Sequence, residues 1–326
     1  MPLSEFDLIR EYFLSRLSSR HDVLLGVGDD AAILQPPEGM ALAVAMDTLV
    51  EGVHFDHHSG PYALGWKAAA VNLSDLAACG AEPAWATLSL TIPQSNASWL
   101  QAFSEGLFDI LSRYDVQLVG GDTCRGPMSV TLELHGFVPA NQVLLRSGAR
   151  VGDKVYLTGP VGLAGLALWG RQHGVDLYAE AAQSLYKALD CPEPQVEAGM
   201  HLRTVATSAI DISDGLIADL GHICALSKVG AVIDVDALPR DPDFELCKAD
   251  LLAQHKITAD ALLALQLTAG DDYQLCLTVP PDQQQYIDNI AGLHCIGAID
   301  DQEGVRCVDT QGRDYVVRTT GYDHFL

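Results

Sequence analysis

Nine aspartates stand out because each lies beside a glycine or at the edge of an apolar segment. Burying several like charges is costly unless cations compensate them. Oxygen ligands without His or Cys companions favour Mg²⁺ or Ca²⁺ over zinc or iron. Convergence of these carboxylates would therefore create a site for a polyphosphate delivered as its magnesium complex. The nine are Asp29, Asp30, Asp47, Asp75, Asp122, Asp211, Asp214, Asp271 and Asp272.

Each of these aspartates taken alone also has a plainer interpretation, as a turn residue or a helix cap. Asp29 and Asp30 lie in GVGDDAA at 26–32, between the apolar runs 23–25 and 31–34, which we expect to belong to the core. The alternative for this stretch is a solvated turn. Asp75 lies three residues after Asn72 among small apolar residues, where it needs a partner unless it caps the helix or faces solvent.

The elements that must position these residues alternate between helices and strands in the first half of the chain. This alternation predicts an α/β domain with a mixed sheet. We place the boundary between two domains, 1–150 and 151–326, where Gly, Ser and charged residues gather near position 150. The expected elements are helices at 3–18, 62–79 (closed by Gly80) and 99–111, and strands at 41–46, 84–92, 116–119 and 128–138.

The second half repeats the arrangement of a strand end, carboxylates, a glycine and a following segment. The turn at 158–165 is rich in glycine but lacks the lysine of a P-loop, so helix packing is a better explanation for it than phosphate binding. A gene-duplication repeat is an open interpretation. The expected elements are strands at 154–157, 209–212, 274–279, 295–299, 305–309 and 314–317, and helices after 165, at 178–189 and at 193–205.

The composition of the 326 residues narrows the class of protein. A net charge of −24 argues against nucleic acid and anionic membranes as partners. The eight cysteines form no Cys-x-x-Cys pair, and no apolar run approaches the ~20 residues of a membrane span. The acidic, amphipathic N-terminal stretch does not resemble a signal peptide. We therefore expect a reduced, cytoplasmic protein of enzyme size.

Six motifs in order along the chain resemble the thiamine-monophosphate kinase family. They are GVGDDAA at 26–32, DTLVEGVHF at 47–55, NLSDLAACGAEP at 72–83, GGDT at 120–123, DISDGL at 211–216 and GYDHF at 321–325. Each motif alone is weak, but together they are specific and span nearly the whole chain. That family is grouped with aminoimidazole-ribonucleotide synthetase, selenophosphate synthetase and hydrogenase-maturation proteins.

The resemblance implies that ATP and thiamine monophosphate react to thiamine diphosphate and ADP with several Mg²⁺ ions. It implies an N-terminal domain for ATP, magnesium and dimerisation, a C-terminal domain completing an inter-domain cleft, and a homodimer. Catalysis would depend most on Asp30, Asp122 and Asp214. The implied metal ligands are Asp30, Asp47, Asp75, Asp122, Asp211 and Asp214, with Met46 through its backbone. The implied nucleotide contacts are Gly121, Asp122, Arg146 and Ser213. The implied thiamine-phosphate contacts are His54, Asp271 and Tyr322.

The chain departs from the family pattern at three places. Ala45 and Met46 stand where a Ser or Thr usually precedes Asp47, so a backbone carbonyl or a water must replace the hydroxyl ligand. Asp271 stands where Glu is usual, which shortens its reach. Tyr322 stands where Trp is common.

The acceptor itself explains why no catalytic triad is evident. A phosphate monoester has a second pKa of about 6 and is mostly dianionic at neutral pH, so it needs positioning rather than a general base. One alternative is another ATP-dependent enzyme of the same superfamily, such as an aminoimidazole-ribonucleotide synthetase. Selenophosphate synthetase is disfavoured because the first cysteine is Cys79. The other alternative is a non-catalytic divalent-cation binding module. It is disfavoured because the sequence contains no loop of the EF-hand pattern.

Overall fold

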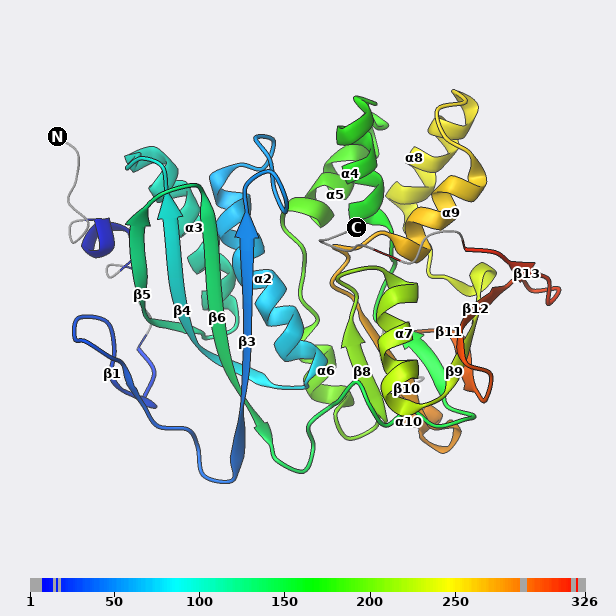
Figure 1. Ribbon diagram of the computed structural model, residues 1–326, viewed down its shortest axis with the longest axis horizontal. Helices are drawn as coiled ribbons and strands as arrows, with labels where there is room; N and C mark the ends of the chain where they lie inside the picture. The colour runs from blue at the N-terminus through cyan, green and yellow to red at the C-terminus, as the bar shows by residue number, and fades with distance from the viewer. Residues whose placement is uncertain (1–7, 14–15, 17–18, 288–291, 318–320, 322–326) are drawn as a thin grey trace. The chain divides into compact units, whose positions relative to one another are not determined.

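The computed structural model describes residues 8–13, 16, 19–287, 292–317 and 321, and it divides the chain into two compact units. The first unit comprises residues 1–76 and 81–143, and the second comprises residues 77–80 and 144–326. Each unit is described by itself (Figure 1). Among the described residues, no helix combines the length and the apolar character needed to span a membrane.

The first unit contains a four-stranded mixed sheet. Its strands are β3 (Met40–Val50), β6 (Ser129–Pro139), β4 (Glu82–Ile92) and β5 (Gln117–Arg125), in that spatial order. Only β4 and β5 are parallel, while the other neighbours are antiparallel. The helices α2 (Pro61–Ala78) and α3 (Ala97–Arg113) cover one face of the sheet (Figure 1).

Glycines allow α2 and α3 to pack with their backbones nearly touching. A Cβ atom on Gly65 would lie 2.1 Å from the carbonyl oxygen of Phe103, and one on Gly106 would lie 1.9 Å from that of Tyr62. At the start of α3, the Asn96 side chain accepts a hydrogen bond from the Trp99 backbone N–H at 3.1 Å. Close helix packing holds α2, and hence Asp75, firmly over the sheet.

The second unit contains a seven-stranded mixed sheet. In spatial order its strands are β13 (Asp314–Tyr315), β12 (Gly304–Val308), β9 (Gly230–Asp234), β11 (His294–Asp300), β7 (Lys154–Leu157), β10 (Leu275–Val279) and β8 (Ser208–Asp211). Only β9 and β12 are parallel among these pairs.

Two apolar clusters stabilise the second unit. One joins the sheet to α7 (Leu216–Ser227), and the other joins a layer of four helices. The helices of that layer are α4 (Leu163–His173), α5 (Ala179–Asp190), α8 (Pro242–Ala253) and α9 (Ala259–Thr268). The unit also contains α6 (Val196–Leu202) and α10 (Gln284–Ile287).

The expected α/β fold with mixed sheets is confirmed, but two predicted strands are too short. β3 continues through Asp47 to Val50, and β5 continues through Asp122 to Arg125. The reason is pairing: β3 is in register with β6 along its full length, from Met40 opposite Pro139 to Val50 opposite Ser129. Charged residues and glycines therefore do not end these strands. Sequence analysis also did not predict β9, α8 and α9, and of the expected first helix the structure describes the turn Ile9–Phe13.

Candidate active site

Asp47 on β3 and Asp75 on α2 face each other in the first unit, and their carboxyl groups form a hydrogen bond. Burial raises the pKa of Asp47, while the bond to Asp75 and the nearby His54 act in the opposite direction. Two carboxyl groups this close share a proton unless a cation neutralises them. The paired oxygen donors fit Mg²⁺, which binds one or two carboxylates together with water and phosphate oxygens.

His54 lies in the loop that connects β3 to α2. Its Nδ1 accepts a hydrogen bond from the Val50 backbone N–H at 3.0 Å, so the neutral ring carries its proton on Nε2. His54 also interacts electrostatically with Asp47 and lowers the pKa of that carboxyl. The structure therefore brings together three of the predicted site residues, His54, Asp47 and Asp75.

The GVGDDAA stretch forms an exposed turn rather than a buried one. Asp29 Oδ1 accepts a hydrogen bond from the Asp30 backbone N–H at 2.8 Å. The expectation that both flanking runs belong to the core is wrong, because Leu24 and Ile33 are 62% and 50% exposed. The flanks form a two-stranded hairpin, β1 (Val23–Leu25) and β2 (Ile33–Leu34), and only one of its faces packs on the cluster around Trp85.

Gly121 and Asp122 lie on β5, at the opposite edge of the sheet from β3. A Cβ on Gly121 would lie 1.9 Å from the Leu88 carbonyl oxygen, so only glycine fits there. Asp122 aligns across the sheet with Ser89, Thr131 and Thr48.

Thr48 follows Asp47 on the same strand, and successive side chains of a strand point to opposite faces. Asp122, which aligns with Thr48, therefore lies on the face of the sheet opposite to that of Asp47. Three strand spacings of about 4.8 Å separate the two edges by roughly 14 Å. Within one chain, the sheet therefore separates Asp122 from the Asp47–Asp75 pair. The Met46 side chain is 64% exposed on the same face as Asp122, which we call the open face. Because this side chain points away from Asp47, only the backbone of Met46 could contact a metal ion beside Asp47.

In the second unit, the segments 211–216 and 269–275 pack against each other. The Asp271 backbone N–H donates to the Ser213 carbonyl oxygen at 3.0 Å, and Ile212 N–H donates to Gln274 O at 2.8 Å. A Cβ on Gly270 would lie 2.0 Å from the Ser213 oxygen. Ser213 and Asp271, expected to contact nucleotide and thiamine phosphate, are thus neighbours.

Asp219 is a buried carboxylate that sequence analysis missed. Its Oδ2 accepts hydrogen bonds from the backbone N–H groups of Ser213, Asp214 and Gly215, each at 3.1 Å. Burial raises the pKa of Asp219 to about 7, and the nearby Asp211 and Asp214 contribute in the same direction. The sequence carried a signal for this role, because Asp219 lies in the first turn of a helix that follows Ser-Asp-Gly, where a carboxylate can accept free backbone N–H groups. Its carboxylate fixes the loop that carries Asp214.

Asp272 does not belong to the acidic site, contrary to its grouping with the other aspartates. Its Oδ2 accepts the Gly162 backbone N–H at 2.7 Å, and its carboxylate also accepts from the N–H groups of Leu163 and Ala164. Burial raises the pKa of Asp272 to about 8. The Asp272 carboxyl thus already accepts the backbone N–H groups at the N-terminus of α4, the donors that a phosphate would otherwise use.

Asp271 and Arg146 are two further predicted residues of the second unit. Asp271 adopts a positive φ of 66°, and its Oδ1 accepts the Tyr273 hydroxyl at 2.9 Å. Arg146 is exposed and follows Leu145, whose carbonyl oxygen accepts the Ala209 N–H of β8 at 3.0 Å. Tyr322 lies outside the described residues.

Comparisons with known proteins now identify the family. Residues 28–138 and 150–306 match the N-terminal and C-terminal domains of AIR synthase related proteins. A thiamine-monophosphate kinase of Escherichia coli O157:H7 is 47% identical, and the alignment covers 100% of this chain and 99% of the relative. The chain belongs to the thiamine-monophosphate kinase family.

Solved structures agree with this membership. The thiamine-monophosphate kinase from Stenotrophomonas maltophilia K279a has a TM-score of 0.85 and 39% identity, covering 97% of this chain and 99% of its own. The complex of AaThiL with AMPPCP and TMP has a TM-score of 0.78 and 28% identity, covering 89% of each chain. The resemblance drawn from the six motifs is confirmed, and the similarity to thiamine-monophosphate kinases extends over the whole chain.

Proposed function

We propose that this protein transfers the γ-phosphoryl group of ATP to thiamine monophosphate, forming thiamine diphosphate and ADP. The observation that carries the proposal is the full-length 47% identity to the Escherichia coli thiamine-monophosphate kinase. The similarity to a structure complexed with AMPPCP and TMP supports the same pair of substrates. The paired Asp47 and Asp75 carboxyls support a reaction between two anionic phosphates, because two adjacent carboxylates can hold the cation that such phosphates need.

The co-substrates would be bound with several Mg²⁺ ions. Asp47 and Asp75 would hold magnesium in the first unit, Asp211 and Asp214 in the second, and Asp30 and Asp122 are further candidates. Bound Mg²⁺ neutralises phosphate charge and stabilises the transition state of phosphoryl transfer. The backbone carbonyl of Met46 would serve where the family has a hydroxyl ligand.

The chain's own residues bind and orient the two phosphates rather than attack them. His54, with its proton on Nε2, offers a donor to the acceptor phosphate. Asp271 and Tyr322 would contact the cationic thiazolium ring, and Gly121, Arg146 and Ser213 the nucleotide. Because the acceptor is already a dianion, transfer needs neither a general base nor a phosphorylated protein.

The decisive experiment mixes the protein with Mg²⁺-ATP and thiamine monophosphate and identifies the products by mass. Thiamine diphosphate formed in equal amount with ADP supports the proposal. ATP hydrolysis without thiamine diphosphate, or no ATP consumption, would contradict it. A labelled phosphoprotein formed from ATP alone would contradict direct transfer.

We also propose that the protein is a cytoplasmic homodimer joined through the open face of the first unit's sheet. Leu42, Val44 and Met46 on β3 are 45%, 53% and 64% exposed, which is a large apolar surface for a monomer. Asp122 lies on this face too, remote from Asp47 in its own chain.

Light scattering tests the dimer. The wild type should have twice the chain mass, and Val44→Glu should shift it toward the monomer. Val316→Glu, at a side chain 75% exposed in the second unit, should leave the mass unchanged. A monomeric wild type at micromolar concentration would contradict the proposal. Fractionation of cells would check the cytoplasmic location.

A further inference from the structure

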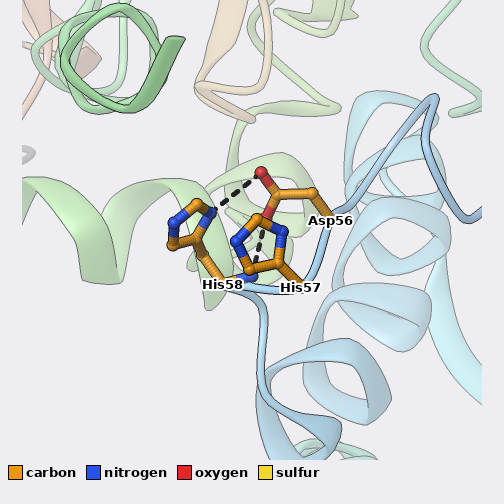
Figure 2. Close-up of side chains that lie close together, drawn as sticks. All are labelled: Asp56, His57 and His58. Carbon is orange, nitrogen blue, oxygen red and sulfur yellow. Dashed lines mark hydrogen bonds and ion pairs between the residues drawn. The ribbon is translucent and has the colours of Figure 1, made fainter. Parts of the chain in front are cut away.

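A second group of potential metal ligands lies outside the carboxylate site. We propose that Asp56, His57 and His58, the Asp-His-His cluster, bind a transition-metal ion of the Zn²⁺ class. Each of the three residues offers one ligand atom, and these atoms all lie within 4.8 Å of one another. Figure 2 shows the three side chains gathered on one side of the loop between β3 and α2.

Local hydrogen bonds bring the cluster together. The Asp56 carboxylate accepts the His58 backbone N–H at 2.8 Å and approaches His58 Nδ1 at 3.1 Å (Figure 2). The His57 and His58 rings lie 3.9 Å apart between centroids. The Ser59 backbone N–H donates to the Asp56 carbonyl oxygen at 3.1 Å, which closes the turn. The backbone therefore already holds the carboxylate and both imidazoles within a small volume.

Small side-chain rotations suffice to complete a coordination sphere. Zinc binds imidazole nitrogen at about 2.0–2.1 Å and carboxylate oxygen at about 2.0–2.2 Å, so neighbouring ligand atoms must approach to roughly 3.3 Å. The Asp56 and His58 side chains are 45% and 48% exposed, so solvent leaves them room to rotate. Three protein ligands leave at least one position to water, which predicts an exchangeable ion rather than a structural one.

The donor set separates this cluster from the magnesium site. Two imidazoles and one carboxylate favour Zn²⁺, Cu²⁺, Ni²⁺ and Co²⁺, whereas Mg²⁺ prefers oxygen ligands and retains its water. The Asp47–Asp75 pair has the opposite preference. The chain's net charge of −24 raises the local concentration of any cation, so selectivity has to come from the ligand type.

Calorimetric titration of untagged protein with Zn²⁺, in millimolar Mg²⁺ to fill the oxygen sites, tests the proposal. The wild type should bind one equivalent of Zn²⁺ that the double variant His57→Gln/His58→Gln does not bind. Asp56→Asn should weaken the binding of this equivalent. His255→Gln, which removes an exposed histidine of the second unit, is the matched control and should retain it.

Imidazole NMR signals provide a second readout that does not depend on kinase activity. The signals of His57 and His58 should shift with Zn²⁺ and stay in place with Mg²⁺. Equal Zn²⁺ binding by the wild type and the double variant, or no Zn²⁺ binding in the presence of Mg²⁺, would overturn the proposal. Unchanged melting temperatures of all variants will show that lost binding is not lost folding.

Discussion

The Asp47–Asp75 pair of the first unit and two buried aspartates of the second unit, Asp219 and Asp272, have different hydrogen-bond partners. Asp47 and Asp75 hydrogen-bond to each other, so their negative charge has to be met by a proton or a cation. Asp219 and Asp272 each accept hydrogen bonds from three backbone N–H groups. These four aspartates therefore fall into two kinds. The Asp47–Asp75 pair calls for a proton or a cation, whereas the buried carboxyls of the second unit fix the backbone.

This difference gives the two kinds different consequences on substitution. Removing a charge from a cation-binding pair relieves repulsion and leaves the fold intact, but it removes a ligand. Removing a carboxylate that accepts buried N–H groups leaves those donors unsatisfied, at a cost of about 1–3 kcal/mol for each group. Substitution of Asp47 should therefore lower activity without loss of stability, whereas substitution of Asp219 or Asp272 should lower stability.

The largest expected effect is that of removing divalent metal. Excess chelator should abolish the formation of thiamine diphosphate, because uncompensated carboxylates repel both phosphate substrates. Added Mg²⁺ should restore it. The measurement is product formation by mass, and full turnover in excess chelator would remove the cation-binding interpretation of Asp47 and Asp75.

Asp47→Asn should lower turnover by roughly a hundredfold or more, since a ligand is lost. The variant should melt at the same temperature as the wild type or higher, because the amide can donate to Asp75. Asp282→Asn, at the surface of the second unit, is the control for a lost charge and should change neither quantity. Unchanged turnover of Asp47→Asn would show that Asp47 is not a ligand of a catalytic metal ion.

Asp219→Ala should lower kcat roughly tenfold to a hundredfold, because the loop carrying Ser213 and Asp214 loses three hydrogen bonds. Asp219→Asn keeps one acceptor oxygen and should recover part of the activity. Steady-state kinetics at a temperature where both variants are folded separates kcat from KM. Equal kcat in the alanine variant and the wild type would show that the carboxylate serves stability alone.

Asp272→Ala should destabilise the protein by about 3 kcal/mol or more, because three backbone N–H groups at the start of α4 lose their acceptor, with kcat of the folded enzyme unchanged. The native pKa near 8 lies above the unfolded value of about 3.9, so the native state binds more protons between them. The contribution of this group to stability is complete below pH 4 and is lost as the pH rises toward 8. Denaturant unfolding should show a flatter pH dependence in Asp272→Asn.

The smallest expected effect is that of Tyr322→Ala, in the tail that follows Gly321. A cation over an aromatic face gains ~0.5–2 kcal/mol, so KM for thiamine monophosphate should rise several-fold while that for ATP stays nearly constant. Tyr322→Trp should be neutral or better, and Tyr286→Ala is a control for an exposed tyrosine elsewhere. An equal change for both substrates would make Tyr322 a structural anchor.

Sequence patterns predicted most elements well where hydrophobic periodicity was strong. The expected helix at 62–79 corresponds to Pro61–Ala78, and Gly80 follows with a positive φ of 66°. Strand ends were predicted poorly at Asp47 and Asp122, because pairing with neighbouring strands continues β3 and β5 through polar residues that local patterns treat as breaks.

The sequence by itself determined the chemistry of this protein: the abundance of carboxylates, the absence of a triad pattern, and six ordered motifs that identify the family. These depend on residue types and their order, which the chain carries before it folds. Only the tertiary structure decided which partner each carboxylate has. Asp75 meets Asp47 because α2 packs over β3, whereas Asp272 meets Gly162 because segments 110 residues apart come together. The partners of Asp219 lie only four to six residues away, but those of Asp47 and Asp272 are set by long-range packing, which local sequence does not encode.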